Sequence, residues 1–362
     1  MSDDLFARLI ELFSHPGPVN WKLAGEISRH LAGDPEPIEP WLAEEYRDLT
    51  RLAQMKIAEV TDLDPGDAID AIPVDRAAWA ALNLESFRYL VEPLAEKLGA
   101  PGAGGPLEGM MIPLGPAILG AQMGIMTGFL SHRILGQFDI GLPRAEAGDL
   151  HLVVPNVEAF AAENQLDARQ VRLWVALHEV THRTEFARSW VRPEFVGLIA
   201  RYLDGLELDP ASLTEKLQSF SDPEQMESIL SDPAGLAGLI TTPEQKPILE
   251  AIQAFMAVIE GYADYLMDRA ALKMLPDLAK MREAMDRRRS EPSQGEQIIN
   301  RMLGLELKQE QYRLGAAFCS EVARRWGQDA VERLWDGADA LPSLGELHDP
   351  VAWAARVLLP DL

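Results

Sequence analysis

Three residues of the segment 171–186 have the types and the spacing of a zinc-binding helix. His178, Glu179 and His182 follow the order His-Glu-x-x-His within the sequence VRLWVALHEVTHRTEF. On a helix the two imidazoles lie one turn apart on one face, so both can meet a single Zn²⁺. The glutamate lies about 100° around the axis from His178, where it can reach a water molecule on that metal. The pattern predicts a hydrolytic zinc site with Glu179 as the catalytic general base.

The third metal ligand decides which class of zinc site this is. The metzincin pattern needs a glycine and a histidine at the positions that Glu185 and Arg188 occupy, which excludes that class. A later segment, EAIQAFMAVIEGYADYLMD, contains Glu260 in apolar surroundings. A carboxylate buried there is costly unless a cation neutralises it, so we expect Glu260 to be the third ligand. Glu185 is the second candidate, although three ligands from one straight helix match a tetrahedron poorly.

The residues around Glu260 suggest how the site is supported. Asp264 lies one turn further on the same helix face, where it can accept a hydrogen bond from the non-ligating nitrogen of a metal-bound histidine. Gly261 leaves room for another backbone to approach, whereas Tyr262 and Tyr265 are expected to face away from the metal. The competing interpretation is structural: two hydrogen-bonded core histidines on one helix and a surface carboxylate on the other.

The two motifs together resemble a known family. HEVTH on one predicted helix and EGYAD on a later one resemble the motifs of gluzincin metallopeptidases. More specifically, LWVALHEVTHRTEF resembles a bacterial family of zincin-like, zinc-dependent metalloproteases, sometimes linked by name to deazaflavin coenzyme biosynthesis, and this resemblance extends over most of the chain. It implies peptidase activity, with zinc held by His178, His182 and Glu260, Glu179 as base and Asp264 as the orienting carboxylate. The interval between the motifs is longer than in familiar gluzincins, so the resemblance does not imply the rest of their fold.

A peptidase of this kind also needs a donor for the oxyanion that develops on the substrate. His151 is the first candidate, because it lies on the predicted strand 150–154. As an edge strand, this segment could also pair with an extended substrate backbone. His132 and His348 are weaker candidates for the same role.

The elements that must position these residues are almost all helical. Apolar residues recur at intervals of three and four, and clusters of proline and glycine separate the segments. The strand 150–154 is followed by a proline, which suits an edge position. The predicted fold class is therefore mainly α: a zincin-like helical core with a minor β edge-strand element. The predicted helical segments are 3–13, 21–32, 41–61, 76–98, 156–203, 244–270, 276–288, 307–326 and 350–359, with surface segments at 204–245 and 289–296.

The domain organisation is predicted from the same pattern. Residues 1–100 read as an N-terminal helical region, and residues 101–362 as the zincin-like metal-binding catalytic region, with a single compact domain as the alternative. The segment 109–130 carries no charge for 22 residues, which is long enough to span a bilayer. Its glycines at every fourth position and the prolines near its start favour a buried helix that packs closely on another. A membrane-associated protease remains the alternative.

Composition limits the function classes further. The chain has 57 acidic and 33 basic side chains and a formal charge of −24, which argues against nucleic acid as a partner. Cys319 is the only cysteine, so neither an intramolecular disulfide nor a cysteine-rich metal site is possible. The N-terminus is acidic where a signal peptide would be basic, and we expect a cytoplasmic protein. The expected partner is a peptide or protein substrate; a non-catalytic, zinc-containing scaffold protein is the alternative.

Overall fold

The computed structural model of the protein describes residues 17–64, 70–98, 115–139, 149–205, 245–271, 274–290 and 309–359. This part of the chain is mainly helical, with one two-stranded sheet, as the predicted fold class requires. Its elements are α2 (Trp21–Ala32), α3 (Pro40–Ala58), β1 (Ala71–Val74), α4 (Arg76–Leu98), α6 (Gly115–Leu130), β2 (Leu150–Val153), α7 (Val154–Glu163), α8 (Ala168–Phe186), α9 (Val191–Asp204), α13 (Lys246–Ala271), α14 (Leu278–Ser290), α16 (Gln309–Trp326), α17 (Gln328–Glu332), α18 (Leu344–His348) and α19 (Pro350–Val357).

The predicted and observed helices agree closely. The segments 21–32 and 76–98 are helical over the predicted residues, and 156–203 is divided among three helices, α7, α8 and α9. The predicted helix 3–13 lies outside the described residues, as do 206–244 and 291–296 of the two predicted surface segments.

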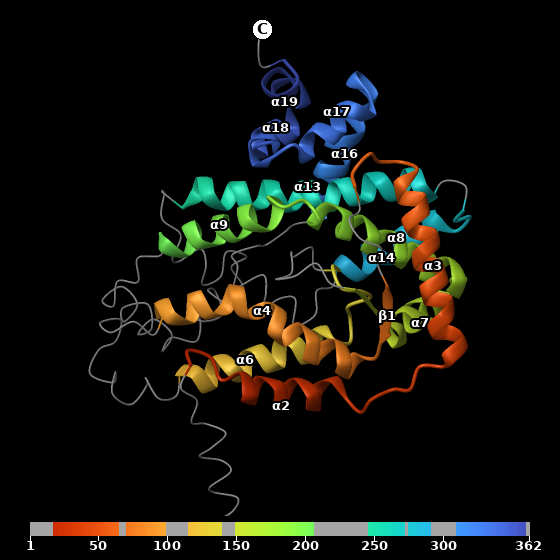
Figure 1. Ribbon diagram of the computed structural model, residues 1–362, viewed down its shortest axis with the longest axis vertical. Coiled ribbons are helices and arrows are strands. Elements are labelled where there is room, and N and C mark those ends of the chain that lie inside the picture. Colours follow the sequence, from red (N-terminus) through yellow and green to blue (C-terminus); the bar gives the residue numbers. More distant parts are fainter. Residues whose placement is uncertain are drawn as a thin grey trace, which may run out of the picture.

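Helix α8 carries the His-Glu-x-x-His motif through the centre of the molecule. Its first turn is capped by Asp167, whose side chain accepts a hydrogen bond from the Gln170 N–H at 2.8 Å. All residues from Val171 to Glu185 are buried, because α3, α7 and α13 pack around this helix. Figure 1 shows α13 and α9 running side by side, with the C-terminal helices on the outer side of α13. The motif is therefore held in a core element and not on a loop.

The sheet consists of β1 and β2, which pair in parallel with Ala71 opposite Leu150. The sequence did not predict β1, since Pro73 interrupts a segment of only four residues. On its other side β2 is bonded to a preceding segment: the Val153 N–H donates to the Leu135 carbonyl at 2.9 Å. At Leu152 and Val153, β2 therefore has backbone partners on both sides in the described part of the chain. The expected pairing of this strand with a substrate stays a prediction.

Helices α2, α4 and α6 pack together as a layer (Figure 1). A methyl group added to Gly120 would lie 2.3 Å from the Asn20 carbonyl oxygen, and one on Gly124 would lie 2.7 Å from that of Ala24. The glycine face of α6 thus permits contact with the backbone of α2, as the four-residue spacing predicted. Residues 109–114 of the predicted apolar segment lie outside the described residues. No helix within the described ranges is long and apolar enough to cross a bilayer.

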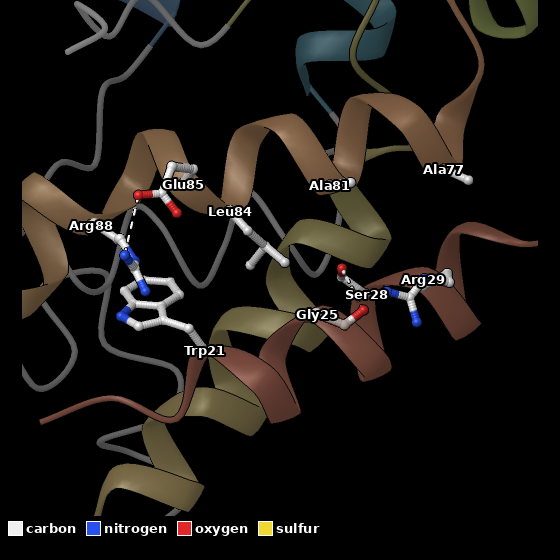
Figure 2. Close-up of a pocket in the computed structure, with 9 residues that line it drawn as sticks. All are labelled: Trp21, Gly25, Ser28, Arg29, Ala77, Ala81, Leu84, Glu85 and Arg88. Carbon is white, nitrogen blue, oxygen red and sulfur yellow. Dashed lines mark hydrogen bonds and ion pairs between the residues drawn. The ribbon is translucent and has the colours of Figure 1, made fainter. Parts of the chain in front are cut away.

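A small cavity of about 240 Å³ lies between α2 and α4 (Figure 2). Trp21 lines it, and its indole N–H donates to Glu92 at 2.9 Å while the Arg88 guanidinium lies 5.3 Å from the ring centre. None of the predicted site residues lines this cavity.

Buried side chains from both sides of residue 100 belong to one hydrophobic cluster. The hydrophobic core is therefore continuous across that position. The division into 1–100 and 101–362 stays a prediction.

Candidate metal centre

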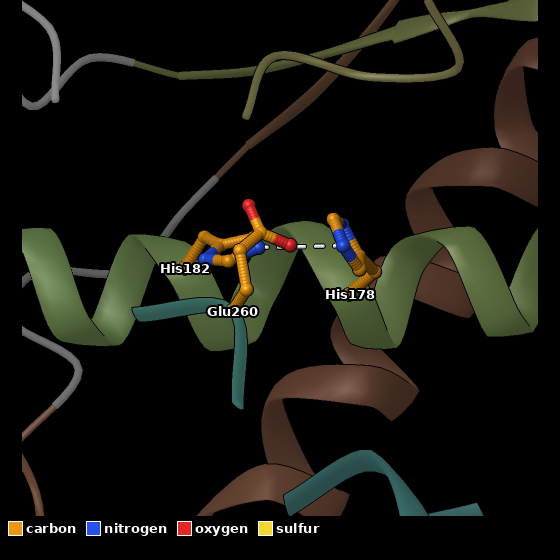
Figure 3. A group of neighbouring side chains, drawn as sticks. All are labelled: His178, His182 and Glu260. Carbon is orange, nitrogen blue, oxygen red and sulfur yellow. Dashed lines mark hydrogen bonds between the residues drawn. The ribbon is translucent and has the colours of Figure 1, made fainter. Parts of the chain in front are cut away.

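The structure brings His178, His182 and Glu260 together (Figure 3). The two imidazoles lie one turn apart on α8, and Glu260 reaches them from α13. Their Nε2 atoms are 3.3 Å apart, and one ligand atom from each of the three residues lies within 4.8 Å of the others. Two nitrogens bound to a tetrahedral zinc at about 2.0–2.1 Å are also about 3.3 Å apart, so the imidazole pair has the spacing that zinc needs.

A hydrogen bond to Glu185 orients the second histidine. The Nδ1 atom of His182 lies 2.7 Å from Glu185 Oε2, and both side chains are fully buried. With Nδ1–H donating to the carboxylate, the lone pair of Nε2 is directed at the candidate metal position. The sequence predicts Asp264 for this orienting role and Glu185 only as an alternative ligand. The orienting role predicted for Asp264 stays a prediction.

The cluster contains more negative charge than its imidazoles can balance. Burial raises the pKa of Glu185 well above its usual value, and the nearby charges of Glu260 and Asp264 raise it further. The Oε1 atom of Glu185 is buried and has no hydrogen-bond partner. Buried carboxylates of this kind are costly without a cation, so the residues fit a divalent metal in chemistry as well as in spacing.

Glu179 is fully buried next to the histidines. Its Oε2 accepts the Phe138 backbone N–H at 2.7 Å, and its Oε1 lies 3.3 Å from His178 Nδ1. Burial raises the pKa of Glu179, although the hydrogen bonds from His178 and Phe138 oppose the shift. Burial lowers the pKa of His178, but its hydrogen bond to Glu179 and the charges of Glu179, Glu260 and Asp139 outweigh this effect and raise it overall. With a raised pKa, the carboxylate of Glu179 accepts a proton more readily than that of an ordinary glutamate.

His178 and Glu179 line a cavity of about 270 Å³. Part of its wall is apolar, and Asp264 also lines it. Two ion pairs, Asp268–Arg282 and Asp286–Arg313, contribute the remaining charged side chains together with Asp139. A substrate in this cavity would lie next to both the first histidine and the candidate base. The apolar lining residues are Leu135, Trp174, Val175, Met285 and Ala316.

None of the three histidines considered for the oxyanion lines this cavity. His151 Nδ1 lies 2.8 Å from Gln137 Oε1, and His132 Nε2 lies 2.8 Å from the Leu31 carbonyl oxygen. His348 is the last residue of α18. A role for His151 in catalysis stays a prediction.

A second, partly buried polar cluster, formed by Thr61, Tyr262, Gln328 and Glu332, also contacts α13. The hydroxyls of Thr61 and Tyr262 are 2.8 Å apart, and each donates to the Glu332 carboxylate at 2.9 to 3.1 Å. The Gln328 amide donates to the same carboxylate at 2.6 Å. Burial raises the pKa of Glu332, and these three hydrogen bonds partly offset the shift. Tyr262 is thus engaged away from the candidate metal centre, as its position on the helix predicted.

Close packing of α13 on α16 fixes the position of Glu260. A methyl group added to Gly261 would lie 2.2 Å from the carbonyl carbon of Gly315, and one on Gly315 would lie 1.8 Å from the Ala257 carbonyl oxygen. Both glycines are needed for this approach of the two backbones. The room expected at Gly261 is therefore occupied by α16.

Comparison with known proteins identifies the family of the chain. The model of the zincin-like metallopeptidase family matches residues 19–354, and the chain belongs to that family, as the sequence resemblance indicated. A crystal structure of a suggested hydrolase with a novel fold from Chloroflexus aurantiacus is 26% identical in sequence and superposes with a TM-score of 0.70. The similarity covers 93% of this chain and 98% of that one. No curated protein matches the chain. The family and the structural neighbour together place the chain among metallohydrolases.

Proposed function

We propose that the protein is a zinc-dependent peptidase, in which His178, His182 and Glu260 hold the metal and Glu179 is the general base. The observation that carries this proposal is the 3.3 Å separation of the two Nε2 atoms, with a buried carboxylate facing them from α13. A zinc ion held there would polarise the scissile carbonyl and lower the pKa of the attacking water.

The protein's own residues then perform the proton transfers. Glu179 accepts the proton of the attacking water and passes it to the departing amine. Its raised pKa suits this exchange, because a base that holds the proton more tightly than a free glutamate can also deliver it. Glu185 keeps the proton of His182 on Nδ1, so that Nε2 remains a ligand.

A catalytic site is better supported than a structural zinc in a scaffold protein. Structural zinc sites use four protein ligands, whereas only three candidate ligands converge within the described ranges. His178 and Glu179 also line a cavity, which leaves access for a substrate. Membership of a metallopeptidase family supports a peptide or a protein as that substrate.

The test is metal analysis of the purified protein together with digestion of a peptide library followed by mass spectrometry. We expect one zinc per chain and cleavage that stops on chelation and returns with zinc. The Glu179→Gln protein is the matched control, since it should bind the metal and cleave at least about 100-fold more slowly. Cleavage at the wild-type rate in the Glu179→Gln protein would overturn the assignment of the base. Zinc binding without cleavage of any peptide would favour the scaffold alternative.

A further inference from the structure

The segment Leu135–Asp139 lies against Glu179 and is fixed at both ends. The Leu135 N–H donates to Asp139 Oδ2 at 2.8 Å, which closes the segment on itself. Its start is tied to the sheet, since the Leu135 carbonyl accepts from β2 at 2.9 Å and Gly136 forms an antiparallel bridge with Leu152. The segment is therefore a positioned part of the core, and no pattern in the sequence predicted it.

Gly136 lies in contact with the Glu179 side chain. A methyl group at this position would lie 2.3 Å from Cδ, 2.4 Å from Oε1 and 2.6 Å from Cγ of Glu179. Such distances are far below van der Waals contact, which is about 3.5–4.0 Å between carbons. Any other residue at position 136 would displace the carboxylate or the segment itself.

The other side of the carboxylate is held by Phe138. Its backbone N–H donates to Glu179 Oε2 at 2.7 Å. The Phe138 ring packs on α8, with its centre 5.0 Å from that of Phe186 and 6.4 Å from that of His182. The hydrogen-bond donor is thus anchored to the helix that carries the carboxylate.

We infer that Gly136 and the Phe138 N–H form a cradle that holds the Glu179 carboxylate at one position beside the candidate metal centre. Gly136 is then a positioning residue, acting through Glu179, and this role rests on the proposed function of Glu179 as the base. Its importance follows from geometry, because displacing a reacting group by about 1 Å can cost about 100-fold in rate.

The first test is the Gly136→Ala protein. We expect zinc content to stay at the wild-type level, kcat to fall by about 100-fold and KM to change little, since the carboxylate moves while the metal ligands and the cavity remain. The matched control is Gly197→Ala in α9, where an added methyl group meets nothing closer than 4.0 Å. A Gly136→Ala protein with wild-type kcat would overturn the inference.

A second readout does not depend on catalysis. The Tm of the zinc-free protein is measured for Gly136→Ala, Glu179→Ala and the double variant. If the cradle is as described, Gly136→Ala lowers Tm strongly in the wild-type background and much less when Glu179 is alanine, because the clashing carboxylate is gone. An equal loss of Tm in both backgrounds would overturn the cradle. This thermal cycle remains decisive even if the wild-type protein cleaves no peptide, so it separates failure of the inference from failure of the proposed function.

Discussion

Two polar clusters, one buried and one partly buried, contact the same helix, α13, and they differ in how the charge of their carboxyl groups is satisfied. In the candidate metal centre, Glu260 lies with His178, His182 and Glu185. In the second cluster, Tyr262 lies with Thr61, Gln328 and Glu332. Each cluster contains a glutamate whose pKa is raised chiefly by burial, Glu185 in the first and Glu332 in the second.

In the second cluster, the residues that form it supply the hydrogen-bond donors that the Glu332 carboxylate needs. Glu332 accepts hydrogen bonds from two hydroxyls and an amide, all of them uncharged donors. The candidate metal centre differs, since Glu185 Oε1 has no hydrogen-bond partner and the nearby charges of Glu260 and Asp264 raise the pKa of Glu185 further. The comparison shows two uses of a polar network. A network whose carboxylate has all its hydrogen-bond donors contributes to folding. A buried network with more carboxyl groups than its donors can satisfy fits a cation.

The largest expected effect comes from removing a metal ligand. His178→Ala, His182→Ala and Glu260→Ala should each lose most of the bound zinc and all hydrolysis, because two protein ligands hold the metal far less tightly than three. Elemental analysis after gel filtration measures the zinc, and a peptide assay the activity. Full zinc stoichiometry in all three proteins would show that the ligands lie elsewhere.

Replacing the base should abolish activity without emptying the site. In the Glu179→Gln protein we expect kcat to fall by about 100- to 10,000-fold, since the amide cannot accept the proton of the attacking water. Zinc content should remain at the wild-type level. Loss of the metal from this protein would make Glu179 a ligand and not a base.

A smaller effect distinguishes the two carboxylates that have been considered as orienting groups. Glu185→Ala should weaken zinc binding by about 10- to 100-fold, the usual cost of removing the hydrogen-bond partner of a metal-bound histidine. Asp264→Ala is the matched variant and should have a smaller effect, because Glu185 is the residue hydrogen-bonded to His182. Titration with a competing chelator measures both affinities. Equal losses of zinc affinity in the two variants would support the orienting role that the sequence predicted for Asp264.

The second cluster should respond in stability and not in metal binding. Tyr262→Phe removes the hydroxyl that donates to Glu332, and we expect the free energy of unfolding to fall by about 1–3 kcal/mol. Zinc affinity should stay close to that of the wild type. Denaturant unfolding of the zinc-free protein measures the first quantity and chelator titration the second. A large loss of zinc affinity would mean that the two clusters are coupled through α13.

The smallest expected effect is a dependence of the free energy of unfolding on pH, caused by Glu332. Because the pKa of Glu332 is higher in the folded chain than in the unfolded one, the folded state binds the proton more tightly. Its contribution to stability is therefore greatest at low pH and declines as pH rises from the unfolded pKa of about 4.3 through the folded pKa. Glu332→Gln should remove this decline, which unfolding curves across that interval can detect. If stability falls equally with rising pH in the wild-type and Glu332→Gln proteins, the raised pKa of Glu332 is contradicted.

Local patterns predicted much of the fold and part of the site. The helix with His178 and His182 could be read from its cap and its apolar run, and Glu260 from its isolation among apolar residues. The cradle could not, because Phe138 and Glu179 are 41 positions apart and Gly136 has no periodic context. The role of Glu185 was missed for another reason. Its spacing from His182 was consistent with both a ligand and a hydrogen-bond partner, and only the positions of the side chains distinguish the two.

The contact between Gly261 and Gly315 has a consequence for the order in which the site is built. During synthesis both histidines and Glu260 emerge from the ribosome before α16, the helix against which α13 is packed. A nascent chain that ends before α16 therefore carries all three candidate ligands but lacks the support that fixes the third. Under the proposed function, tight zinc retention should consequently begin only after α16 has been made.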